Sequence, residues 1–530
     1  MKYLLTRNIF SALLISICIN LPIYVIAWHL HGIWPALRWG YLPLYVLFFF
    51  FIISMRSAGL RNIFLIFCAA LDLIQMCHFA YYGAYIPPLR YELIFTEFDE
   101  IFLAATGTWS HMWYVPLLTL APWFVLFYFL RKKPPYAVPF IWLGAIVMLI
   151  FISVRAYVRP IYDAYPHPHR FPLINSLHSV ASYFVKFLPL QKSLGKEKYE
   201  PYIPSIEETS PNNIIVVMGE SFSPGHMSLF GYERETTPFL DSLKSDPNFI
   251  YTKGYSASVT TRQTCMLFMN VVREPLFAKW LEGRKSNLFK LAKEKGYTTY
   301  YISAQKLSLL RDVGIEFVDH LVTIEDEPAL FEQKSDQALL EIFKKMPKGE
   351  KVFVVFHQRC AHDPYHLYYQ HLPDLARYAT QHVSTVQFRI NSYDNAILFN
   401  DLVFKEIVSY FKQYSDLPTY IFITSDHGES LGEGGKWGHS MLDVSIGTVP
   451  FLFYGIKANP DVMHRLRDMS AITHYEMGKE IARLMGIRIN NPNEKDHTYT
   501  IMGPHLFGLD GHITIDKSQS PPVLTVHKPV

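Results

Sequence analysis

The chain has 530 residues, enough for more than one domain, and 50% of them are hydrophobic while 15% are aromatic. Its formal net charge of +3 is small, and no basic tract or base-stacking motif accompanies it, which argues against nucleic-acid binding. Almost all long apolar runs lie before residue 158. We therefore expect a membrane-embedded part followed by a globular part.

Five apolar segments before residue 158 are predicted to form transmembrane helices. Most of them approach the roughly 20 residues that a helix needs to cross a bilayer, although the second is short. The first segment lacks a small-residue cleavage site and is followed by further segments, which favours an anchor over a signal peptide. The five segments are residues 8–28, 40–55, 62–82, 112–130 and 136–155.

Basic residues beside these segments predict the orientation of the chain. They lie before the first segment, between the second and third, and between the fourth and fifth, so all of them are expected on the cytoplasmic side. Everything after residue 158 then lies outside. This predicts a multi-pass protein of a bacterial inner membrane with its globular part in the periplasm. The basic residues are Lys2, Arg7, Arg56, Arg61 and residues 131–133.

The third apolar segment contains two titratable residues, Asp72 and His78. A charged side chain within a bilayer is costly, which makes both residues functional candidates. The alternative is that they face another helix or an aqueous cleft.

The following external loop carries Glu92, Thr96 and Glu100. A spacing of four residues places the three side chains on one face of a predicted helix. Acidic groups beside a membrane surface suit the ammonium group of a lipid. A solvated charged face is the alternative.

Residues 158–212 are rich in Pro, Tyr and His and predict a connector, in which the amphipathic stretch 173–187 forms a helix lying on the membrane. From residue 213 onward strands and helices alternate, as in a doubly wound α/β domain. Strands are predicted at 214–218, 298–302, 352–356, 419–424 and 449–454, and helices near 286–296, 332–346 and 385–413.

Polar residues that follow two buried strands predict a metal site. Glu220 ends the apolar run 214–219, and Asp426 and His427 follow the strand at 419–424. In open α/β sheets, ligands bind at the carboxyl ends of the strands. Thr260 and Thr261 precede another apolar run, at a predicted helix N-terminus that favours phosphate. The two threonines either cap that helix or supply a nucleophile beside a divalent cation.

Two further histidines lie at informative positions. His362 comes shortly after the strand at 352–356, and His439 follows Asp426 and His427 in a Gly-rich loop. A single histidine is more often structural than functional. Several near the ends of parallel strands make a functional role more plausible.

Four segments, read together, resemble the phosphoethanolamine transferases of the alkaline phosphatase superfamily. They are residues 219–221, 225–238, 393–401 and 425–433. The resemblance implies a five-helix N-terminal transmembrane bundle over 1–157 and a periplasmic connector over 158–212. It also implies an alkaline-phosphatase-like, or sulfatase-like, α/β/α catalytic domain over 213–530.

The resemblance also implies the roles of single residues. Glu220, Asp426, His427 and Thr260 would bind zinc, and Thr260 would be the nucleophile. Thr261 is the close alternative, because the family pattern has one threonine where this chain has two. His362 and His439 would serve the phosphoryl group or a second metal. The ethanolamine lipid would be held by Glu92, Thr96 and Glu100.

The implied reaction transfers phosphoethanolamine from phosphatidylethanolamine to lipid A, lipopolysaccharide core or a periplasmic glycan, through a phospho-threonine intermediate, in a monomeric membrane enzyme. A phosphoglycerol transferase or a metal-dependent phosphodiesterase of the same superfamily is the alternative. From a different class, a catalytically silent lipid-binding protein is a further alternative. The five cysteines do not predict a disulfide framework, and a pair between Cys265 and Cys360 stays open.

Overall fold

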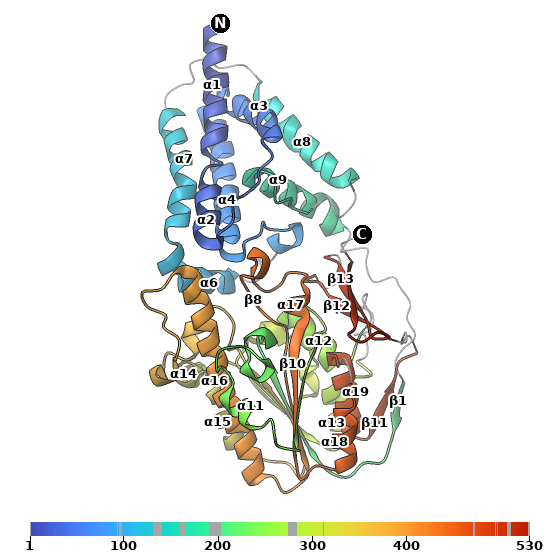
Figure 1. The fold of residues 1–530 in the computed structure, drawn as a ribbon. Coiled ribbons are helices and arrows are strands. Elements are labelled where there is room, and N and C mark those ends of the chain that lie inside the picture. Colours follow the sequence, from blue (N-terminus) through green and yellow to red (C-terminus); the bar gives the residue numbers. More distant parts are fainter. Residues whose placement is uncertain are drawn as a thin grey trace. The chain divides into compact units, whose positions relative to one another are not determined.

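The protein divides into two compact units (Figure 1). One comprises residues 1–193 with the short segment 431–438, and the other comprises residues 194–430 and 439–529. The computed structural model describes residues 2–92, 94, 98–130, 140–159, 165–189, 203–273, 284–310, 312–469, 472–492, 494, 497–505 and 510–527.

The first unit is helical. Two of its helical stretches, Asn8–His31 and Ala58–Tyr82, are long and apolar enough to cross a membrane by length and composition, and three shorter apolar helices accompany them. Helix therefore covers or overlaps each predicted apolar segment, while the count of five spans stays a prediction. The helices are α1 Lys2–Cys18, α2 Pro22–His31, α3 Leu42–Ile53, α4 Ala58–Tyr82, α6 Phe98–Met112, α7 Tyr114–Leu130, α8 Trp142–Val158 and α9 Pro172–Ser182.

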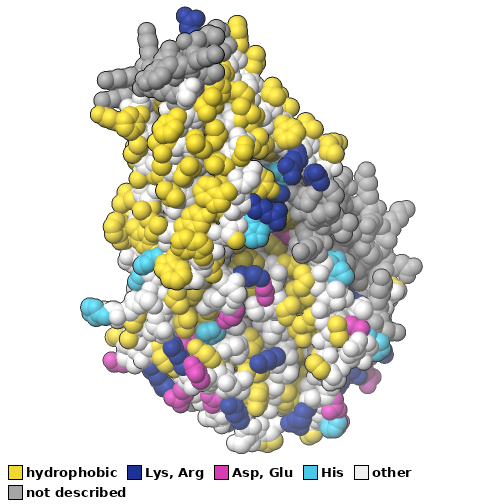
Figure 2. Space-filling model, turned by 45° about the horizontal axis from the view of Figure 1, so that its top comes forward, with side chains coloured by type: hydrophobic (Ala, Val, Ile, Leu, Met, Phe, Trp, Pro, Cys, Tyr) yellow, Lys and Arg dark blue, Asp and Glu magenta, His cyan; other side chains and the backbone are white. Residues whose placement is uncertain are grey.

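Hydrophobic side chains cover much of the visible surface of these helices (Figure 2). Among the most exposed are Trp28, Phe124, Phe129 and Val158, each more than 60% accessible. Apolar side chains of this size are rarely gathered on the outside of a water-soluble domain. Their exposure fits a helical unit that is surrounded by lipid.

The polar residues of α4 have partners inside the unit. Asp72 is buried and accepts a hydrogen bond from Trp123 Nε1 of α7 at 3.0 Å. His78 Nδ1 donates to the carbonyl of Ala84 at 2.8 Å, and its Nε2 lies 3.0 Å from Arg90 Nη1. Asp72 therefore faces another helix, α7, which was the alternative to a functional role.

The predicted amphipathic stretch forms α9, which continues as the π-helical turn η4, Tyr183–Phe187. Helix α9 packs against α4 and α8, and Ser176 donates to Leu71 O of α4 at 3.3 Å. Most of its residues are buried within the unit. Its placement on a membrane surface stays a prediction.

The second unit is built on a seven-stranded sheet in the order β3-β10-β7-β2-β6-β4-β5. The five predicted strands are all present, and the structure adds β3 and β5. The sheet is mixed, because β10 is antiparallel to β7 and to β3. The strands are β2 Asn213–Gly219, β3 Phe249–Tyr255, β4 Thr298–Ser303, β5 His320–Val322, β6 Val352–His357, β7 Thr419–Ser425 and β10 Thr448–Ile456.

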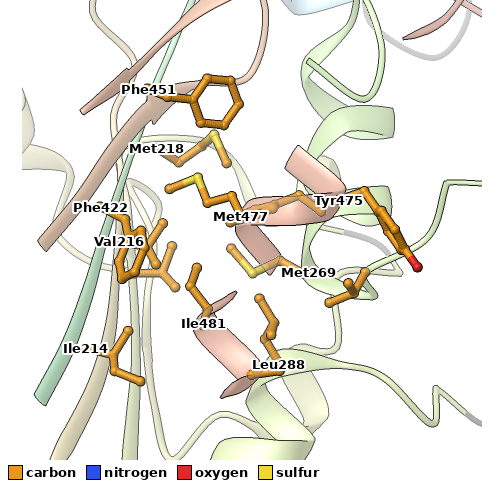
Figure 3. Packing of buried hydrophobic residues seen from close by; sticks show 14 of the residues in the cluster. Ile214, Val216, Met218, Met269, Leu288, Phe422, Phe451, Tyr475, Met477 and Ile481 are labelled. Carbon is orange, nitrogen blue, oxygen red and sulfur yellow. The ribbon is translucent and has the colours of Figure 1, made fainter. Parts of the chain in front are cut away.

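Helices cover both faces of this sheet, so the α/β/α expectation is met. On one face Val216, Phe422 and Phe451 of the sheet pack near Met477 and Ile481 of α19 (Figure 3). On the other face, Phe343 of α15 contacts Phe356 of β6 and Phe411 of α16, with ring centroids 5.6 Å apart in both pairs. The helices are α12 Thr261–Met269, α13 Leu288–Glu294, α15 Gln337–Lys345, α16 Thr385–Tyr414, α18 Pro460–Arg467 and α19 His474–Leu484.

Smaller elements complete the second unit. The helix predicted at 332–346 is divided into α14, Pro328–Lys334, and α15, because Ser335 adopts a positive φ of 51°. Strand β1, Ile203–Ile206, pairs with β11, Ile487–Asn490, while β12, Thr498–Met502, β13, His512–Asp516, and β14, Val523–His527, form a separate sheet. Cys265 and Cys360 are buried and unpaired.

Candidate metal centre

The register of two parallel strands brings the first two predicted ligands together. Gly219 at the end of β2 is paired with Ser425 at the end of β7. The next residues, Glu220 and Asp426, therefore leave the sheet side by side at its carboxyl edge. The connection is tight, because Asp426 N donates to Gly219 O and Ser221 N donates to Asp426 Oδ1, both at 3.0 Å.

Glu220, Asp426 and His427 form a buried group whose ligand atoms all lie within 4.8 Å of one another. His427 Nε2 is 3.5 Å from Glu220 Oε1 and 3.3 Å from Asp426 Oδ2. His427 Nδ1 donates to the carbonyl of Gly428 at 3.0 Å, so Nε2 is the ring nitrogen on the side of the two carboxylates.

The chemistry of this group suits a divalent cation. Asp426 Oδ2 is buried and has no hydrogen-bond partner among the described residues. Burial raises the pKa of Glu220 well above its usual value, and the nearby Asp426 carboxylate raises it further. Two buried carboxylates and an imidazole nitrogen that converge on one point are costly, and a bound cation reduces that cost. The residues present therefore fit a metal ion.

Of the two candidate threonines, Thr261 is the one whose hydroxyl reaches both Glu220 and His427. Its Oγ1 lies 3.2 Å from Glu220 Oε2 and 3.2 Å from His427 Nε2. Thr260 is the residue before α12, with extended backbone angles of −142° and 146°, and its hydroxyl lies 3.5 Å from Ser258 Oγ. The structure thus brings the hydroxyl of Thr261, the close alternative, to Glu220 and His427, while the predicted role of Thr260 as ligand and nucleophile stays a prediction.

His362 and His439 are brought to the same place. Ligand atoms of Glu220, His362 and His439 lie within 4.8 Å of one another, as do those of His427, Glu429 and His439. The rings of His427 and His439 are stacked with centroids 4.4 Å apart. Two additional groups that could hold a cation or a phosphoryl group thus adjoin the first.

Glu429 fixes the orientation of the His439 ring through a hydrogen bond. Glu429 Oε2 accepts from His439 Nδ1 at 2.9 Å, and Oε1 accepts from the Tyr365 hydroxyl at 2.6 Å. The carboxyl is buried, which raises its pKa to about 7. Sequence reasoning quoted this glutamate within a motif but gave it no role.

Sequence reasoning also missed Gln305. Its Nε2 donates to Glu220 Oε2 at 2.8 Å and to Gln358 O at 3.1 Å, while its Oε1 accepts from Arg359 Nη1 at 3.3 Å. Gln305 thereby fixes the orientation of the Glu220 carboxylate. Gln305 could have been predicted from its position two residues beyond β4, because polar residues at the carboxyl ends of parallel strands, such as Glu220, are expected at the ligand-binding edge of the sheet.

The turn after Glu220 is held by a tyrosine from α16. Ser221 adopts a left-handed φ of 60°, which is strained for a residue with a side chain. The buried Tyr393 hydroxyl donates to Ser221 O at 2.6 Å and accepts from Ser223 N at 2.8 Å. These two bonds keep the backbone in the conformation that presents Glu220.

The remaining motif residues bind one another rather than the metal group. Asp394 is fully buried and contacts Arg234 Nη1 at 2.7 Å, His226 Nδ1 at 2.8 Å and the Tyr232 hydroxyl at 3.0 Å. Asp401 accepts from two backbone N–H groups at the start of α11, Pro238–Ser242. The segments 225–238 and 393–401 are therefore a paired structural support.

The predicted lipid-side residues lie in the first unit. Glu92 is half-buried and follows the 3-10 turn η2, Pro88–Tyr91. Thr96 lies outside the described residues. Glu100 is in α6, with its side chain outside the described part of the chain. Their predicted common helical face therefore stays a prediction.

Comparison with known proteins identifies the family. The sulfatase family model matches residues 212–487, just over half of the chain. The chain belongs to the sulfatase family. This family model covers β2, β7 and the candidate metal ligands Glu220, Asp426 and His427.

Curated relatives of this sulfatase-family chain include phosphoethanolamine transferases. The chain is 27% identical over 265 residues to phosphoethanolamine transferase EptC of Escherichia coli O18:K1:H7, covering 46% of this chain and 44% of that protein. It is 26% identical over 239 residues to the Kdo(2)-lipid A phosphoethanolamine 7''-transferase of Salmonella typhimurium, covering 42% and 39%. The matched region spans less than half of each relative.

A solved structure extends the likeness to both units. The integral membrane lipooligosaccharide phosphoethanolamine transferase A from Neisseria meningitidis matches 91% of this chain and 95% of its own, with a TM-score of 0.60 and 16% sequence identity. At this identity the comparison establishes a shared fold. That fold includes the helical unit as well as the sulfatase-like unit.

Proposed function

We propose that this protein is a membrane-anchored, zinc-dependent phosphoethanolamine transferase. One observation carries the proposal: the Thr261 hydroxyl lies 3.2 Å from both Glu220 Oε2 and His427 Nε2, inside a buried group that fits a divalent cation. A hydroxyl placed this way is suited to nucleophilic attack on phosphorus. The similarity to named phosphoethanolamine transferases supports the choice of transferred group.

Glu220, Asp426, His427 and Thr261 are the proposed ligands of the zinc ion. Two carboxylate oxygens, an imidazole nitrogen and a hydroxyl match the four-ligand sites that zinc prefers. When bound, zinc would lower the pKa of the Thr261 hydroxyl and offset negative charge on the phosphoryl group. Gln305 and Tyr393 maintain the ligand geometry through their bonds to Glu220 and to its turn.

The proposed reaction has two halves. The Thr261 oxygen attacks the phosphorus of phosphatidylethanolamine, the bond to the diacylglycerol oxygen breaks, and diacylglycerol leaves after taking up a proton. An acceptor hydroxyl then attacks the phospho-threonine and frees Thr261. His362 and His439 adjoin Glu220, where they can bind the phosphoryl oxygens and move these protons.

The membrane setting is proposed from the first unit. Its apolar helices and exposed aromatic side chains support a multi-pass anchor in a bacterial inner membrane. The basic residues before and between its segments support a periplasmic location for the second unit. A lipid donor and a lipid A, core or glycan acceptor are both accessible from that side. Glu92, Thr96 and Glu100 remain the proposed contacts of the ethanolamine lipid.

The test is to trap and map the covalent intermediate. Purified full-length protein is incubated with vesicles that contain phosphatidylethanolamine with an isotope-labelled headgroup, and the digested protein is analysed by mass spectrometry. We expect a phosphoethanolamine adduct on Thr261. Thr261→Ala should remove it and lower turnover by several powers of ten, as loss of a covalent nucleophile does. Thr260→Ala is the matched control and should keep the adduct.

The same assay separates the alternatives. A phosphoglycerol adduct formed from phosphatidylglycerol would identify a phosphoglycerol transferase. Release of free phosphoethanolamine without transfer to added lipid A would identify a hydrolase. An adduct on Thr260, or a metal-bearing protein with no adduct on either residue, would contradict the proposal.

A further inference from the structure

A narrow apolar slot lies within the helical unit, between α3, α8 and the start of α9. Phe48 of α3, Met148 and Ile152 of α8 and Leu177 of α9 form its walls. The free space in the slot is about 50 Å³, so the part of an occupant that enters it must be small, as a stretch of acyl chain is. The slot lies outside the metal centre, in the other unit of the chain.

Cationic side chains line the same slot. Arg155 comes from the last turn of α8, and Arg170 lies two residues before α9. Arg170 Nη1 is buried and has no hydrogen-bond partner among the described residues. A buried guanidinium nitrogen without a partner calls for an anion. In Figure 2 a group of Lys and Arg side chains lies at the edge of the hydrophobic surface.

The remaining polar lining is neutral or basic. His178 of α9 also faces the slot, and no acidic side chain occurs among the described residues that line it. The site therefore offers nothing to bind an ammonium group, while two guanidinium groups favour a phosphate. This charge pattern distinguishes the slot from the acidic residues proposed to contact the ethanolamine lipid.

We propose that this slot binds an anionic membrane phospholipid, with an acyl chain between α3 and α8 and its phosphate on Arg155 and Arg170. The apolar walls require an acyl chain, which a free phosphate ion lacks. The two arginines at one slot require net negative charge, which a zwitterionic headgroup lacks. The site is separate from the transfer reaction and does not depend on the proposed function.

The test measures lipid selectivity directly. Full-length protein in detergent is mixed with phosphatidylglycerol or with phosphatidylcholine of the same acyl chains, and bound lipid is counted by native mass spectrometry. We expect preferential retention of phosphatidylglycerol. Inorganic phosphate at the same concentration should neither bind nor displace it.

Variants separate the charge from the slot. Arg155→Gln combined with Arg170→Gln should weaken phosphatidylglycerol binding by about tenfold or more, the size of one to two kcal/mol of lost interaction. Arg159→Gln, an exposed arginine on the same chain segment that does not line the slot, is the matched control and should change binding less than about twofold. Ile152→Trp fills the slot without changing charge and should also weaken binding.

Several results would overturn this proposal. Equal retention of both lipids by the unaltered protein would remove the charge argument, and displacement by inorganic phosphate would point to a free-anion site. Unchanged binding in Ile152→Trp would remove the acyl-chain argument. If the double arginine variant fails to fold, the lipid comparison on the unaltered protein and the Ile152→Trp variant still decide the question.

Discussion

His439 Nδ1 donates a hydrogen bond to Glu429 Oε2 at 2.9 Å, and this bond fixes the orientation of the imidazole ring at the candidate metal centre. Because Nδ1 donates to Glu429, any contact of His439 with a phosphoryl group or a cation is expected to use Nε2. The Tyr365 hydroxyl holds the other oxygen of Glu429 at 2.6 Å, so the carboxylate cannot turn away. Glu429 is therefore a positioning residue.

The first prediction follows from that bond. Glu429→Ala should lower turnover by about 10- to 100-fold, the usual effect of removing a carboxylate behind a catalytic histidine. Glu429→Gln still accepts from His439 but without charge, so it should recover part of the activity and shift the pH profile of turnover. Steady-state rates between pH 6 and about pH 9 measure this. Glu316→Gln, at an exposed carboxylate, is the control.

The second prediction concerns the metal. Asp426→Asn keeps the shape of the side chain but removes one of two buried negative charges, so zinc should fall well below one per chain and turnover should be lost. Chelation of the unaltered protein should abolish turnover reversibly, with recovery on adding zinc. Elemental analysis of both proteins checks the outcome. Asp461→Asn, on the exposed first turn of α18, should retain full zinc, and stoichiometric zinc in Asp426→Asn would refute the ligand assignment.

The third prediction tests the support beneath Glu220. Tyr393→Phe leaves Ser221 O and Ser223 N buried without their partner, each at a cost of about 1–3 kcal/mol. We expect a lower unfolding midpoint together with weaker zinc retention during dialysis. Tyr414→Phe lies on the same helix with 62% of the residue exposed and should behave as the unaltered protein. A variant with reduced stability but unchanged zinc affinity would show that the turn is not needed to present Glu220.

Much of the metal centre could be predicted because its causes are local. The strands before Glu220 and Asp426 are buried on both faces of the sheet, so their residues are mostly apolar. The first charged residue after each apolar run therefore marks the end of the strand. Parallel register then placed the two ends together. The same logic would have found Gln305 after β4.

The choice between Thr260 and Thr261 could not be made locally. Successive residues at a helix start point about 100° apart, so a shift of one residue decides which hydroxyl reaches Glu220. That start is set by distant contacts: Val259 N donates to Met502 O at 3.2 Å, and Ser256 N donates to Gly447 O at 2.9 Å. The antiparallel direction of β10 is likewise a tertiary outcome that its apolar sequence does not carry.

The last prediction uses His474, a buried histidine that bonds to the loop before α12. His474 Nδ1 accepts from Ala257 N at 3.1 Å, so Nε2 carries the proton and donates to Thr424 Oγ1 at 3.2 Å. Burial lowers the pKa of His474 from 6.5 to about 3. The unfolded chain therefore binds a proton below about pH 6.5 that the folded chain refuses until about pH 3. The stability contributed by neutral His474 is fully present above pH 6.5 and is lost as the pH falls through this window.

Other buried groups act in the same pH range, so a difference measurement is needed. Burial raises the pKa of Asp336 and of Asp401 to about 7. Their contribution to the stability of the folded protein therefore falls as the pH rises, which is opposite to the pH dependence contributed by His474. His474→Gln keeps one acceptor and one donor but cannot titrate. Between pH 7 and pH 5 the unaltered protein should lose up to about 2 kcal/mol more unfolding free energy than this variant. Denaturant unfolding curves in detergent at both pH values give these free energies, with the exposed His464→Gln as control. Parallel pH dependence of the unaltered and His474→Gln proteins would show that His474 is not held neutral in the folded chain.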